Sequence, residues 1–419
     1  MARQDAWRQD AIAASIGVLL GADGMTGRRT GVGRVTLEMA RTLRKPSSDS
    51  SLGDPARLAD MALLIGDSVA PPDLLDHMPE AAAAPPSRAR AVLAHARAVA
   101  SRCPTVVALH GWRLRRRLDH LAREMARRIG GGIVYHESNL IARPFDGATV
   151  VMVHDLSWRA HPALHPPERV AWIERRLPAT LRQATRFVSV SDFTARTMVT
   201  ELGIDRARID VVSPGVSPMF RPMDAPDAAP VLARHRLADL GYILAVSTIE
   251  PRKNFDRLLA AHARLPPALR ARTTLVIAGG RGWGRALDDD RAAQAQRDGS
   301  LRLLGHVPDV ELVALYARAA VVAYPSLYEG FGLPVLEAMA CGAPVVTSDS
   351  TALRDTAGDA ALLVDPLDTD AIAAALRRVL EDADLAAGLR ARGTAHAARF
   401  TWERMATGML ESWRTALAA

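Results

Sequence analysis

In the second half of the chain, short apolar and β-branched runs alternate with amphipathic segments long enough to form helices. The strand-like runs are Tyr242–Ser247, Thr274–Ala278, Leu301–Leu304, Ala320–Tyr324, Pro344–Thr347 and Ala361–Val364. The helical segments between most of them are Asn254–Leu265, Asp309–Arg318, Pro334–Cys341 and Thr369–Leu380. Strands that lack an apolar–polar alternation are buried on both faces, so the pattern predicts a parallel sheet covered by helices. We therefore expect a Rossmann-like, doubly wound α/β domain.

The first half repeats this pattern less regularly and is expected to form a second such domain. Its strand candidates are Ala14–Leu20, Met61–Ile65, Thr105–Leu109, Gly132–Tyr135, Val150–His154, Arg186–Val190 and Ile209–Val212. Several prolines between the halves indicate a linker. The predicted division is an N-terminal domain (1–215), a Pro-rich linker (216–235), a C-terminal domain (236–400) and a final helix (401–419) that packs back on the first domain. Two such domains would face each other across a ligand-binding cleft.

Composition excludes several other classes of protein. Apolar residues make up 49% and charged residues 24% of the 419 residues, which is the balance of a soluble globular chain. No run approaches the ~18 apolar residues that a membrane-spanning helix requires. We find no secretory signal, and the two cysteines, Cys103 and Cys341, are too few for a disulfide framework. These features predict a cytoplasmic protein.

Positive charge is concentrated in the first half. Residues 1–220 contain 30 arginines and lysines against 22 acidic residues, whereas the remainder contains 23 against 24. The densest cluster comprises Arg113, Arg115, Arg116 and Arg117, with Trp112 and leucines between them. Such a helix can lie on the anionic inner face of the cytoplasmic membrane, and a solvated arginine-rich helix is the alternative. No nucleic-acid recognition motif accompanies the charge, so we expect no nucleic-acid partner.

One strand–loop–helix segment contains two glutamates and a glycine-punctuated loop. It reads YPSLYEGFGLPVLEAM over residues 324–339. Gly330 and Gly332 allow a ligand to approach the backbone closely, and the following helix presents free N–H groups to an anion. Glu329 lies in the loop and Glu337 about one turn into the helix, so both can face the same ligand. Strand–loop–helix units with glycines also occur without a ligand.

Two adjacent cations, Arg252 and Lys253, follow the first strand of the second half. Cations at the carboxyl end of a parallel strand suit a diphosphate leaving group, whose negative charge must be neutralised as its bond breaks. The chain contains only two lysines, Lys45 and Lys253, and lysine offers a compact point charge that arginine does not. A solvated turn is the alternative, but the strand-end position favours a phosphate site.

Two further features follow strands of the first half. Gly31 and Gly33 belong to a glycine-rich loop that precedes a helix predicted over Val35–Leu43, and their backbone N–H groups can face a phosphate. His154 ends a predicted strand and can hydrogen-bond a sugar hydroxyl there. A purely structural histidine is the alternative.

Together these segments resemble the family-four retaining glycosyltransferases, whose GT-B fold consists of two Rossmann-like domains. The resemblance runs from about Gly24 to Pro366. It is most specific in the E-x7-E pair with a Gly-Phe-Gly-Leu-Pro core and in the Glu-Pro-Arg-Lys-Asn segment. The matching positions are 329–337, 250–254, 31–34 (Gly-Val-Gly-Arg) and 154–155 (His-Asp).

The resemblance implies a role for each of these residues. Arg252 and Lys253 would hold the donor diphosphate, Glu337 would bind the ribose hydroxyls, and the backbone near Val307 would contact the base. The catalytic residues would be His154 and Glu329, which lie against the transferred sugar. The donor-binding residues would be Gly31, Gly33, Arg252, Lys253, Val307, Gly330, Phe331, Gly332, Leu333 and Glu337.

The resemblance also implies the reaction. Such enzymes transfer a hexose from a nucleotide-sugar substrate with retention of configuration, and they need neither a cofactor nor a divalent metal. The Glu-Pro-Arg-Lys-Asn subgroup favours mannose or a related sugar from a GDP-sugar over a UDP-sugar. Its acceptors are lipid-linked or saccharide intermediates of O-antigen and exopolysaccharide assembly. Thr248 departs from the pattern of many members, which have an arginine there and thus more positive charge at the diphosphate.

Two apparent metal sites have simpler explanations. Asp288-Asp289-Asp290 resembles the acidic triplet that holds a metal in other glycosyltransferases, but it precedes a helical segment and is better interpreted as an acidic first turn. His161 and His165 have the spacing of metal ligands, yet the prolines at 162 and 166 make a regular helix face improbable.

Other functions remain possible for the same fold. A nucleotide-sugar 2-epimerase would share the cleft, and a non-catalytic scaffold subunit would share the architecture. The presence of Glu329, Lys253 and His154 together argues against a scaffold. A nicotinamide dehydrogenase is a poorer match, because no G-x-G-x-x-G with a suitably spaced acidic residue is evident.

Overall fold

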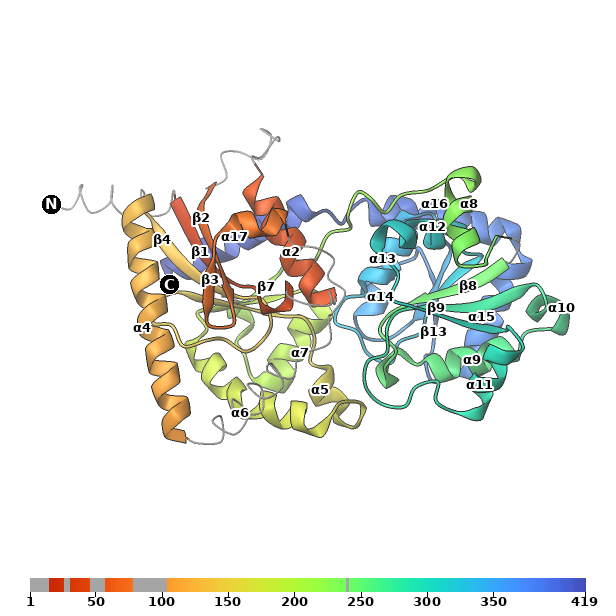
Figure 1. The fold of residues 1–419 in the computed structure, drawn as a ribbon, viewed down its shortest axis with the longest axis horizontal. Coiled ribbons are helices and arrows are strands. Elements are labelled where there is room, and N and C mark those ends of the chain that lie inside the picture. The colour runs from red at the N-terminus through yellow and green to blue at the C-terminus, as the bar shows by residue number, and fades with distance from the viewer. Residues whose placement is uncertain (1–14, 26–30, 46–56, 78–103, 239–240) are drawn as a thin grey trace.

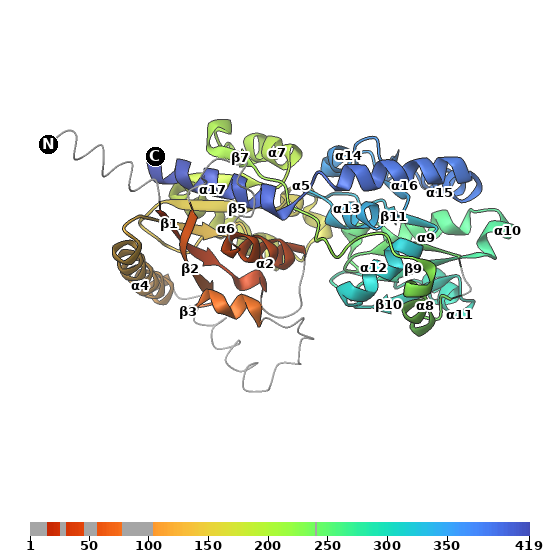
Figure 2. The ribbon, with the colours of Figure 1, turned by 90° about the horizontal axis from the view of Figure 1, so that it is seen from above.

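The computed structural model describes residues 15–25, 31–45, 57–77, 104–238 and 241–419. These residues form two halves, each built around one sheet with helices on both faces (Figures 1 and 2). The N-terminal half lies on the left of Figure 1 and the C-terminal half on the right. This is the two-domain α/β arrangement that the alternating pattern predicts.

The N-terminal half has a seven-stranded sheet, within the described ranges, in the order β3-β2-β1-β4-β5-β6-β7. Neighbouring strands pair in parallel except β3, which runs antiparallel to β2 at the edge. Every residue of β5 is buried, as expected for a strand covered on both faces. The strands are β1 (Ser15–Gly21), β2 (Arg57–Ile65), β3 (Ser68–Ala70), β4 (Gly132–Glu137), β5 (Thr149–Val153), β6 (Arg186–Ser189) and β7 (Ile209–Val211).

The C-terminal half has a parallel sheet of six described strands in the order β10-β9-β8-β11-β12-β13. Buried apolar residues fill both faces of it, and β9, β11 and β12 are buried throughout. The strands are β8 (Gly241–Val246), β9 (Thr273–Ala278), β10 (Leu301–Gly305), β11 (Val321–Tyr324), β12 (Val345–Ser348) and β13 (Leu362–Val364).

Helices and short 3-10 turns (η) connect the strands and cover the sheets. In the N-terminal half they are η1 (Asp23–Met25), α2 (Gly31–Arg44), η2 (Pro72–Asp76), α4 (Pro104–Ile129), α5 (Ser157–Ala160), η3 (Pro162–Leu164), α6 (Pro167–Gln183), α7 (Asp192–Leu202) and η4 (Arg206–Arg208). The others are α8 (Ala225–Arg234), η5 (Pro251–Lys253), α9 (Phe255–Ala263), α10 (Pro267–Arg270), α11 (Asp290–Arg297), α12 (Asp309–Arg318), α13 (Leu333–Ala340), α14 (Thr351–Ala357), α15 (Thr369–Glu381), α16 (Ala383–Ala397) and α17 (Trp402–Ala418).

Each sheet changes its winding direction near the centre. The strand order places β1 beside β4 in the first sheet and β8 beside β11 in the second, with earlier strands on one side and later strands on the other. Such switch points leave a crevice at the carboxyl ends of the two central strands, where ligands of this fold bind. The loops after β8 and β11 contain Arg252, Lys253 and Glu329.

Along the part of the chain that the structure describes, the backbone crosses between the halves twice, and the two crossings lie side by side. Val216 N donates to Phe400 O at 3.0 Å. A Cβ atom on Gly215 would lie 2.3 Å from Trp402 N, so the backbones approach too closely for a larger residue. After the second crossing, α17 packs against α2 and strands β4 to β7 of the first sheet (Figures 1 and 2). Its buried face consists of Trp402, Met405, Ala406, Met409, Ser412, Trp413 and Ala416.

Two local predictions are wrong, and the predicted linker is partly helical. The run Thr105–Leu109, predicted as a strand, lies in α4, because Pro104 suits a first helical turn and a short apolar run does not distinguish strand from helix. The Pro-rich linker contains α8, whose prolines lie in its first turn and at Pro230, and α8 packs on α12. Gly31 and Gly33 lie in the first turn of α2 rather than in a loop before it. Residues 26–30 of that loop lie outside the described residues.

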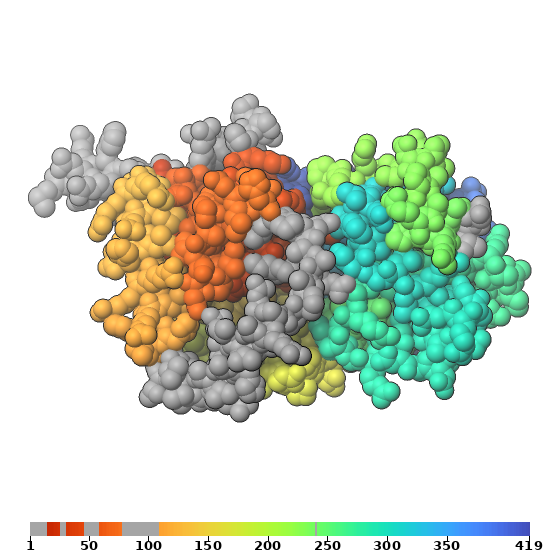
Figure 3. Space-filling model, in the orientation of Figure 1, coloured from red at the N-terminus to blue at the C-terminus, as the bar shows by residue number. Residues whose placement is uncertain are grey.

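Helix α4 runs along the outer edge of the N-terminal half, away from the C-terminal half (Figures 1 and 3). Its four clustered arginines differ in their surroundings. Arg115 pairs with Asp146 at 3.3 Å, and Arg117 donates to Asp67 O at 2.6 Å. Arg116 stacks on the half-exposed Trp112 ring at 4.4 Å, and Arg113 is exposed beside them. Among the helices that the structure describes, none combines the length and apolar character needed to cross a bilayer.

Candidate functional site

The two segments singled out in the C-terminal half meet at its switch point. Turn η5 follows β8, and the loop 325–332 follows β11 and leads into α13. Leu327 N donates to Arg252 O at 2.9 Å, and Asn254 Nδ2 donates to Pro325 O at 2.9 Å. These bonds hold the two segments against each other at the carboxyl ends of neighbouring strands.

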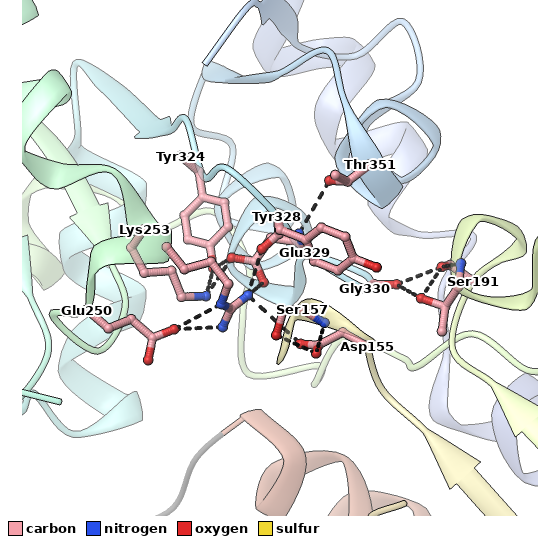
Figure 4. A network of polar contacts seen from close by, with 12 residues as sticks. Asp155, Ser157, Ser191, Glu250, Lys253, Tyr324, Tyr328, Glu329, Gly330 and Thr351 are labelled. Atoms are coloured by element: carbon pink, nitrogen blue, oxygen red, sulfur yellow. Dashed lines mark hydrogen bonds and ion pairs between the residues drawn. The ribbon is translucent and has the colours of Figure 1, made fainter. Parts of the chain in front are cut away.

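A compact cluster of charges forms around Glu329, which is 7% exposed (Figure 4). Its carboxylate accepts hydrogen bonds from Arg252 Nη1 at 2.9 Å, Lys253 Nζ at 2.5 Å and Tyr324 Oη at 3.0 Å. Both cations are buried as well. Charge-assisted bonds of this kind are the stronger hydrogen bonds in proteins, so Glu329, Arg252 and Lys253 form one unit.

Arg252 is fixed by partners from both halves of the molecule. Glu250 Oε1 accepts from its Nη2 at 2.7 Å and from its Nε at 3.1 Å, and Tyr328 O accepts from Nη1 at 2.7 Å. Asp155 of the N-terminal half lies 3.9 Å away. The Asp155 carboxylate is itself oriented by Ser157, whose N and Oγ lie at 3.0 and 2.7 Å.

The charges in this cluster determine its protonation. Burial by itself raises the pKa of Glu329, but the charges of Arg252 and Lys253 outweigh it and hold the pKa below its ordinary value. Burial would lower the pKa of Lys253, yet the carboxylate of Glu329 contributes to holding it above its usual range. Both groups are therefore ionised at neutral pH. Because Glu329 already neutralises Arg252 and Lys253, these cations can neutralise a phosphate only if their contacts with Glu329 weaken or break.

Gly330 lies in close contact with the N-terminal half. Its carbonyl accepts hydrogen bonds from Ser191 Oγ at 2.6 Å and Thr194 Oγ1 at 3.2 Å, both from the N-terminal half (Figure 4). A Cβ atom on Gly330 would lie 1.7 Å from His154 O. The glycine is thus required by contact between the two halves, whereas the sequence suggested contact with a ligand.

The residues after Gly330 shape the start of α13. Gly332 has a φ of +111°, a left-handed conformation that favours glycine. The Phe331 side chain is buried against Phe400, and its carbonyl accepts from Thr356 Oγ1 at 2.7 Å. Leu333 begins the helix and packs partly on the main core.

A second charged cluster joins the halves at Glu337. Arg34 of α2 donates to the carboxylates of Glu337 and Asp309, and Tyr316 Oη donates to Glu337 at 3.2 Å. The Arg34 guanidinium also lies 5.7 Å from the Phe220 ring centroid. Burial raises the pKa of Glu337 above its ordinary value although the charge of Arg34 opposes this. Glu337 and Glu329 therefore lie in separate clusters with different partners.

The glycines of the first half have different surroundings. A Cβ atom on Gly33 would lie 2.0 Å from Gly24 O, so this residue allows α2 to pack on η1. Gly31 begins α2 and is exposed. A Cβ atom there would have no neighbour within 4 Å among the described atoms.

His154 follows β5 directly and is partly buried at the carboxyl end of the first sheet. Its Nε2 lies 2.9 Å from Ser138 O, and because a carbonyl only accepts, Nε2 carries the proton and Nδ1 can accept. Burial lowers the pKa of His154 more than this bond and the charge of Asp155 raise it. The side chain is therefore neutral at physiological pH.

Val307 follows β10, and its side chain is buried, so its backbone is what can face a ligand.

The acidic triplet at residues 288–290, interpreted above as a helix start, lies at the beginning of α11. Asp289 caps α11 by accepting from Ala292 N at 2.9 Å, and Asp290 lies in the first turn, which confirms the predicted helix start. Asp288 pairs with Arg281 at 2.5 Å.

The two histidines with metal-like spacing lie on short elements. The His161 ring contacts the Tyr328 ring at 5.6 Å between centroids, and His165 packs on Trp283 at 5.6 Å. Over the described residues, no three His, Cys, Asp or Glu side chains are arranged as a metal site.

A cavity of about 530 Å³ also lies between the halves, lined by Ala160, His161, Pro162, Ala163, Leu164, Leu327, Asp349, Ser350, Asp365, Pro366 and Leu367.

The sequence did not identify Arg34, Tyr324, Glu250 or Asp155 as residues of the site. All four lie in the motifs described above, but nothing in the sequence shows that Tyr324 reaches Glu329 or that Arg34 reaches Glu337. Their positions in these motifs, at strand ends and in the Gly-Val-Gly-Arg segment, were the available signal.

Comparison with known proteins gives consistent matches over most of the chain. The model of the family described as "Glycosyl transferases group 1" matches residues 234–396, and that of "Glycosyltransferase Family 4" matches residues 133–220. O-antigen chain mannosyltransferase B of Escherichia coli is 38% identical over 281 residues, which cover 67% of this chain and 74% of that protein.

Two further similarities concern a wider group. D-inositol 3-phosphate glycosyltransferase of Salinispora arenicola is 37% identical over 254 residues, which cover 57% of this chain and 56% of that protein. The chain thus matches little more than half the length of this relative. The crystal structure of Anabaena Alr3699/HepE in complex with UDP-glucose has a TM-score of 0.65 at 16% identity and covers 94% of this chain and 98% of that one. Together with the family matches, this likeness confirms the expected GT-B fold.

Proposed function

Because this chain belongs to the group 1 glycosyltransferases and has the GT-B fold, we propose that it transfers mannose or a related hexose from a GDP-sugar, with retention of configuration. The observation that carries the proposal is the buried unit of Glu329, Arg252 and Lys253 at the switch point of the second sheet, with Asp155 of the first sheet 3.9 Å from Arg252. The mannosyltransferase relative supports the sugar, and the family resemblance supports the GDP-sugar.

The donor would lie across the carboxyl ends of β8 and β11. Arg252 and Lys253 would neutralise its diphosphate, and Glu337 would bind the ribose hydroxyls. The backbone at Val307 would contact the base, and the first turn of α2 at Gly31 and Gly33 would lie towards the phosphates. Loop residues Gly330, Phe331, Gly332 and Leu333 would present their backbone to the sugar.

The transfer needs two changes at the anomeric carbon and one proton transfer. Its bond to the diphosphate oxygen breaks, its bond to the acceptor oxygen forms on the same face, and the acceptor's proton passes to the departing phosphate. Positive charge develops at the anomeric carbon meanwhile, and the Glu329 carboxylate would stabilise it. Neutral His154, with Nδ1 free to accept, would hold a sugar hydroxyl. Arg252 and Lys253 would replace a divalent metal at the leaving group.

The acceptor would be a lipid-linked or saccharide intermediate of surface polysaccharide assembly, as the O-antigen relative suggests. The exposed face of α4 would hold the enzyme on the cytoplasmic face of an anionic membrane. Trp112, Arg113 and Arg116 would make this contact, since Arg115 and Arg117 have partners within the protein.

A donor panel tests the proposal most directly. Incubation with GDP-mannose, UDP-glucose and other nucleotide sugars, scored by thermal shift, should give the largest stabilisation with GDP-mannose. Ligand at 100 times its dissociation constant stabilises by about 2.7 kcal/mol. Release of an epimerised donor, with no sugar transferred or hydrolysed, would instead indicate a 2-epimerase. Stabilisation by none of these nucleotides would contradict any donor-binding function.

The roles of the two glutamates can be separated by kinetics and calorimetry. Glu329→Gln should depress turnover strongly and leave nucleoside-diphosphate affinity near wild type, because its charge matters most in the transition state. Glu337→Gln should weaken nucleotide and donor binding together and change saturated turnover less. The reverse outcome would exchange the two roles, and no effect of either would remove the main support for the proposed reaction.

A further inference from the structure

Tyr324 is the last residue of β11, and its hydroxyl lies inside the cluster around Glu329. The phenol oxygen is 2.9 Å from Lys253 Nζ and 3.0 Å from Glu329 Oε1, and the residue is 3% exposed. Figure 4 shows the ring beside the lysine side chain, with the hydroxyl directed at the ion pair. The ammonium nitrogen also lies 5.3 Å from the ring centroid. Lys253, Glu329 and Tyr324 thus form a closed triangle of polar contacts.

The chemistry of the three groups fixes the direction of each bond. An ammonium can only donate and a carboxylate can only accept, so the phenol must accept from Lys253 and donate to Glu329. Burial, reinforced by the negative charge of Glu329, raises the pKa of Tyr324 to about 12. The phenol therefore keeps its proton at neutral pH and remains a donor to the carboxylate.

Another buried tyrosine in the same sheet shows that this arrangement is specific to its position. Tyr242 lies on the neighbouring strand β8, is 1% exposed, and donates its hydroxyl to Leu315 O at 2.7 Å. That bond links the strand to a helix and touches no charged group of the cluster. The two hydrogen bonds of the Tyr324 hydroxyl, by contrast, both go to side chains, those of Lys253 and Glu329. Both of these side chains are proposed to act on the donor.

We propose that Tyr324 is a positioning residue of the transfer reaction, whose hydroxyl keeps the Glu329 carboxylate directed at the transferred sugar while Lys253 engages the diphosphate. This inference rests on the proposed function. A diphosphate competes with Glu329 for Lys253, so donor binding weakens the shortest of the three contacts to the carboxylate. Arg252 faces the same phosphates. The phenol is neutral, is not drawn to an anion in the same way, and can hold Glu329 in place during that exchange.

The test is Tyr324→Phe, which removes one oxygen and keeps the ring, with Tyr242→Phe as the matched control. Turnover of GDP-mannose should fall about tenfold or more in Tyr324→Phe, since a hydrogen bond to a charged group is lost. The affinity for GDP in calorimetric titration should change by no more than about threefold. Tyr242→Phe loses a buried hydroxyl from the same sheet and should leave both quantities near wild type.

The pH profile of turnover separates positioning from packing. Loss of the phenol donor raises the pKa of Glu329, which must be ionised, so the acid limb should move to higher pH in Tyr324→Phe alone. Stability gives the same information without an assay for activity. A carboxyl group whose pKa is depressed in the folded protein stabilises it at neutral pH and loses this effect as pH falls. The acid decrease in Tm should therefore begin at higher pH in Tyr324→Phe than in Tyr242→Phe.

Each outcome has a distinct meaning. Unchanged turnover and an unchanged acid limb would overturn the inference, and so would equal losses in both tyrosine variants. A loss of GDP affinity as large as the loss of turnover would show that Tyr324 acts through the Lys253–phosphate contact instead. Full activity of Glu329→Gln would contradict the proposed function itself, on which the role of Tyr324 rests. An inactive Glu329→Gln together with a fully active Tyr324→Phe would contradict only the positioning role of Tyr324.

Discussion

Replacing Arg34 by methionine should tighten the binding of a nucleoside diphosphate. Arg34 and Tyr316 donate to Glu337, and the Glu337 side chain is only 5% exposed with Arg34 in place. A ribose that binds this carboxylate must therefore displace the guanidinium. Arg34→Met removes that competitor and keeps the apolar stem of the side chain.

The size of the effect follows from the contact that is lost. A hydrogen bond between charged groups contributes about 1.5–3 kcal/mol, which corresponds to roughly 10- to 150-fold in affinity. The Arg34–Glu337 pair is about one-fifth exposed on the arginine side, and solvent reduces its strength, so we expect the lower end of this range. The contact also links the two halves, so the variant without nucleotide should have a lower Tm.

Calorimetric titration of GDP at pH 8 is the appropriate measurement. Burial already raises the pKa of Glu337, and loss of Arg34 removes the charge that opposes this. In the variant, binding should therefore weaken at a higher pH than in wild type as the solution becomes acidic. Arg196→Met is the control, because Arg196 also bridges the halves, to Asp355 at 3.3 Å, but through an exposed pair. It should leave GDP affinity unchanged.

Two results would refute this reasoning. Weaker GDP binding in Arg34→Met would mean that the guanidinium contacts the nucleotide itself. Unchanged binding, with Glu337→Gln also unchanged, would mean that the ribose does not reach Glu337 and that the Arg34 cluster serves only to join the halves.

Three further predictions concern the cations. Lys253→Ala should lower turnover in steady-state kinetics by about ten- to a hundredfold. Lys253→Arg should restore little of this turnover, because the planar guanidinium does not replace the compact charge of an ammonium group in a closed cluster. Full activity of the alanine variant would mean that the phosphates bind elsewhere. EDTA should leave donor hydrolysis largely intact, and strict dependence on manganese or magnesium would require a new assessment of Asp288–Asp290. Reversing the charges of Arg113 and Arg116 should abolish binding to anionic vesicles at low salt and spare GDP binding, whereas Arg115→Glu should matter less; a Debye length of ~10 Å at 0.1 M predicts a steep salt dependence.

The architecture could be predicted from the sequence because the signals for strands and helices are local patterns of apolar and polar residues. Unalternated apolar runs separated by amphipathic segments identified both sheets, and the start of α11 at Asp289–Asp290 followed from acidic residues at a helix terminus. The failures were also local ambiguities. Thr105–Leu109 has the composition of a strand, and only its continuation into the long arginine-rich helix α4 decides otherwise.

The sequence could not reveal which polar groups of the site neutralise one another. The sequence predicted that Arg252 and Lys253 bind a diphosphate, but it gave no internal partner for them. In the structure Glu329, more than 70 residues away along the chain, binds both. Glu337 was expected to face a ribose, and in the structure Arg34 from the other half of the molecule binds it. These pairings depend on how the two halves approach, which no spacing within a motif encodes.

The pairing of the site residues with one another has a consequence for catalysis. Leaving Lys253, Arg252 and Glu337 buried without partners would cost several kcal/mol per ion, so a donor site of this charge density needs internal counterions before the donor binds. Glu329 supplies one for the phosphate-binding cations, and Arg34 supplies one for the ribose-binding carboxylate. A donor that brings both a diphosphate and a ribose can replace both contacts together, whereas inorganic phosphate or a free nucleoside replaces only one. Binding energy from the intact nucleotide would thereby release Glu329 towards the sugar, the step at which its charge lowers the barrier.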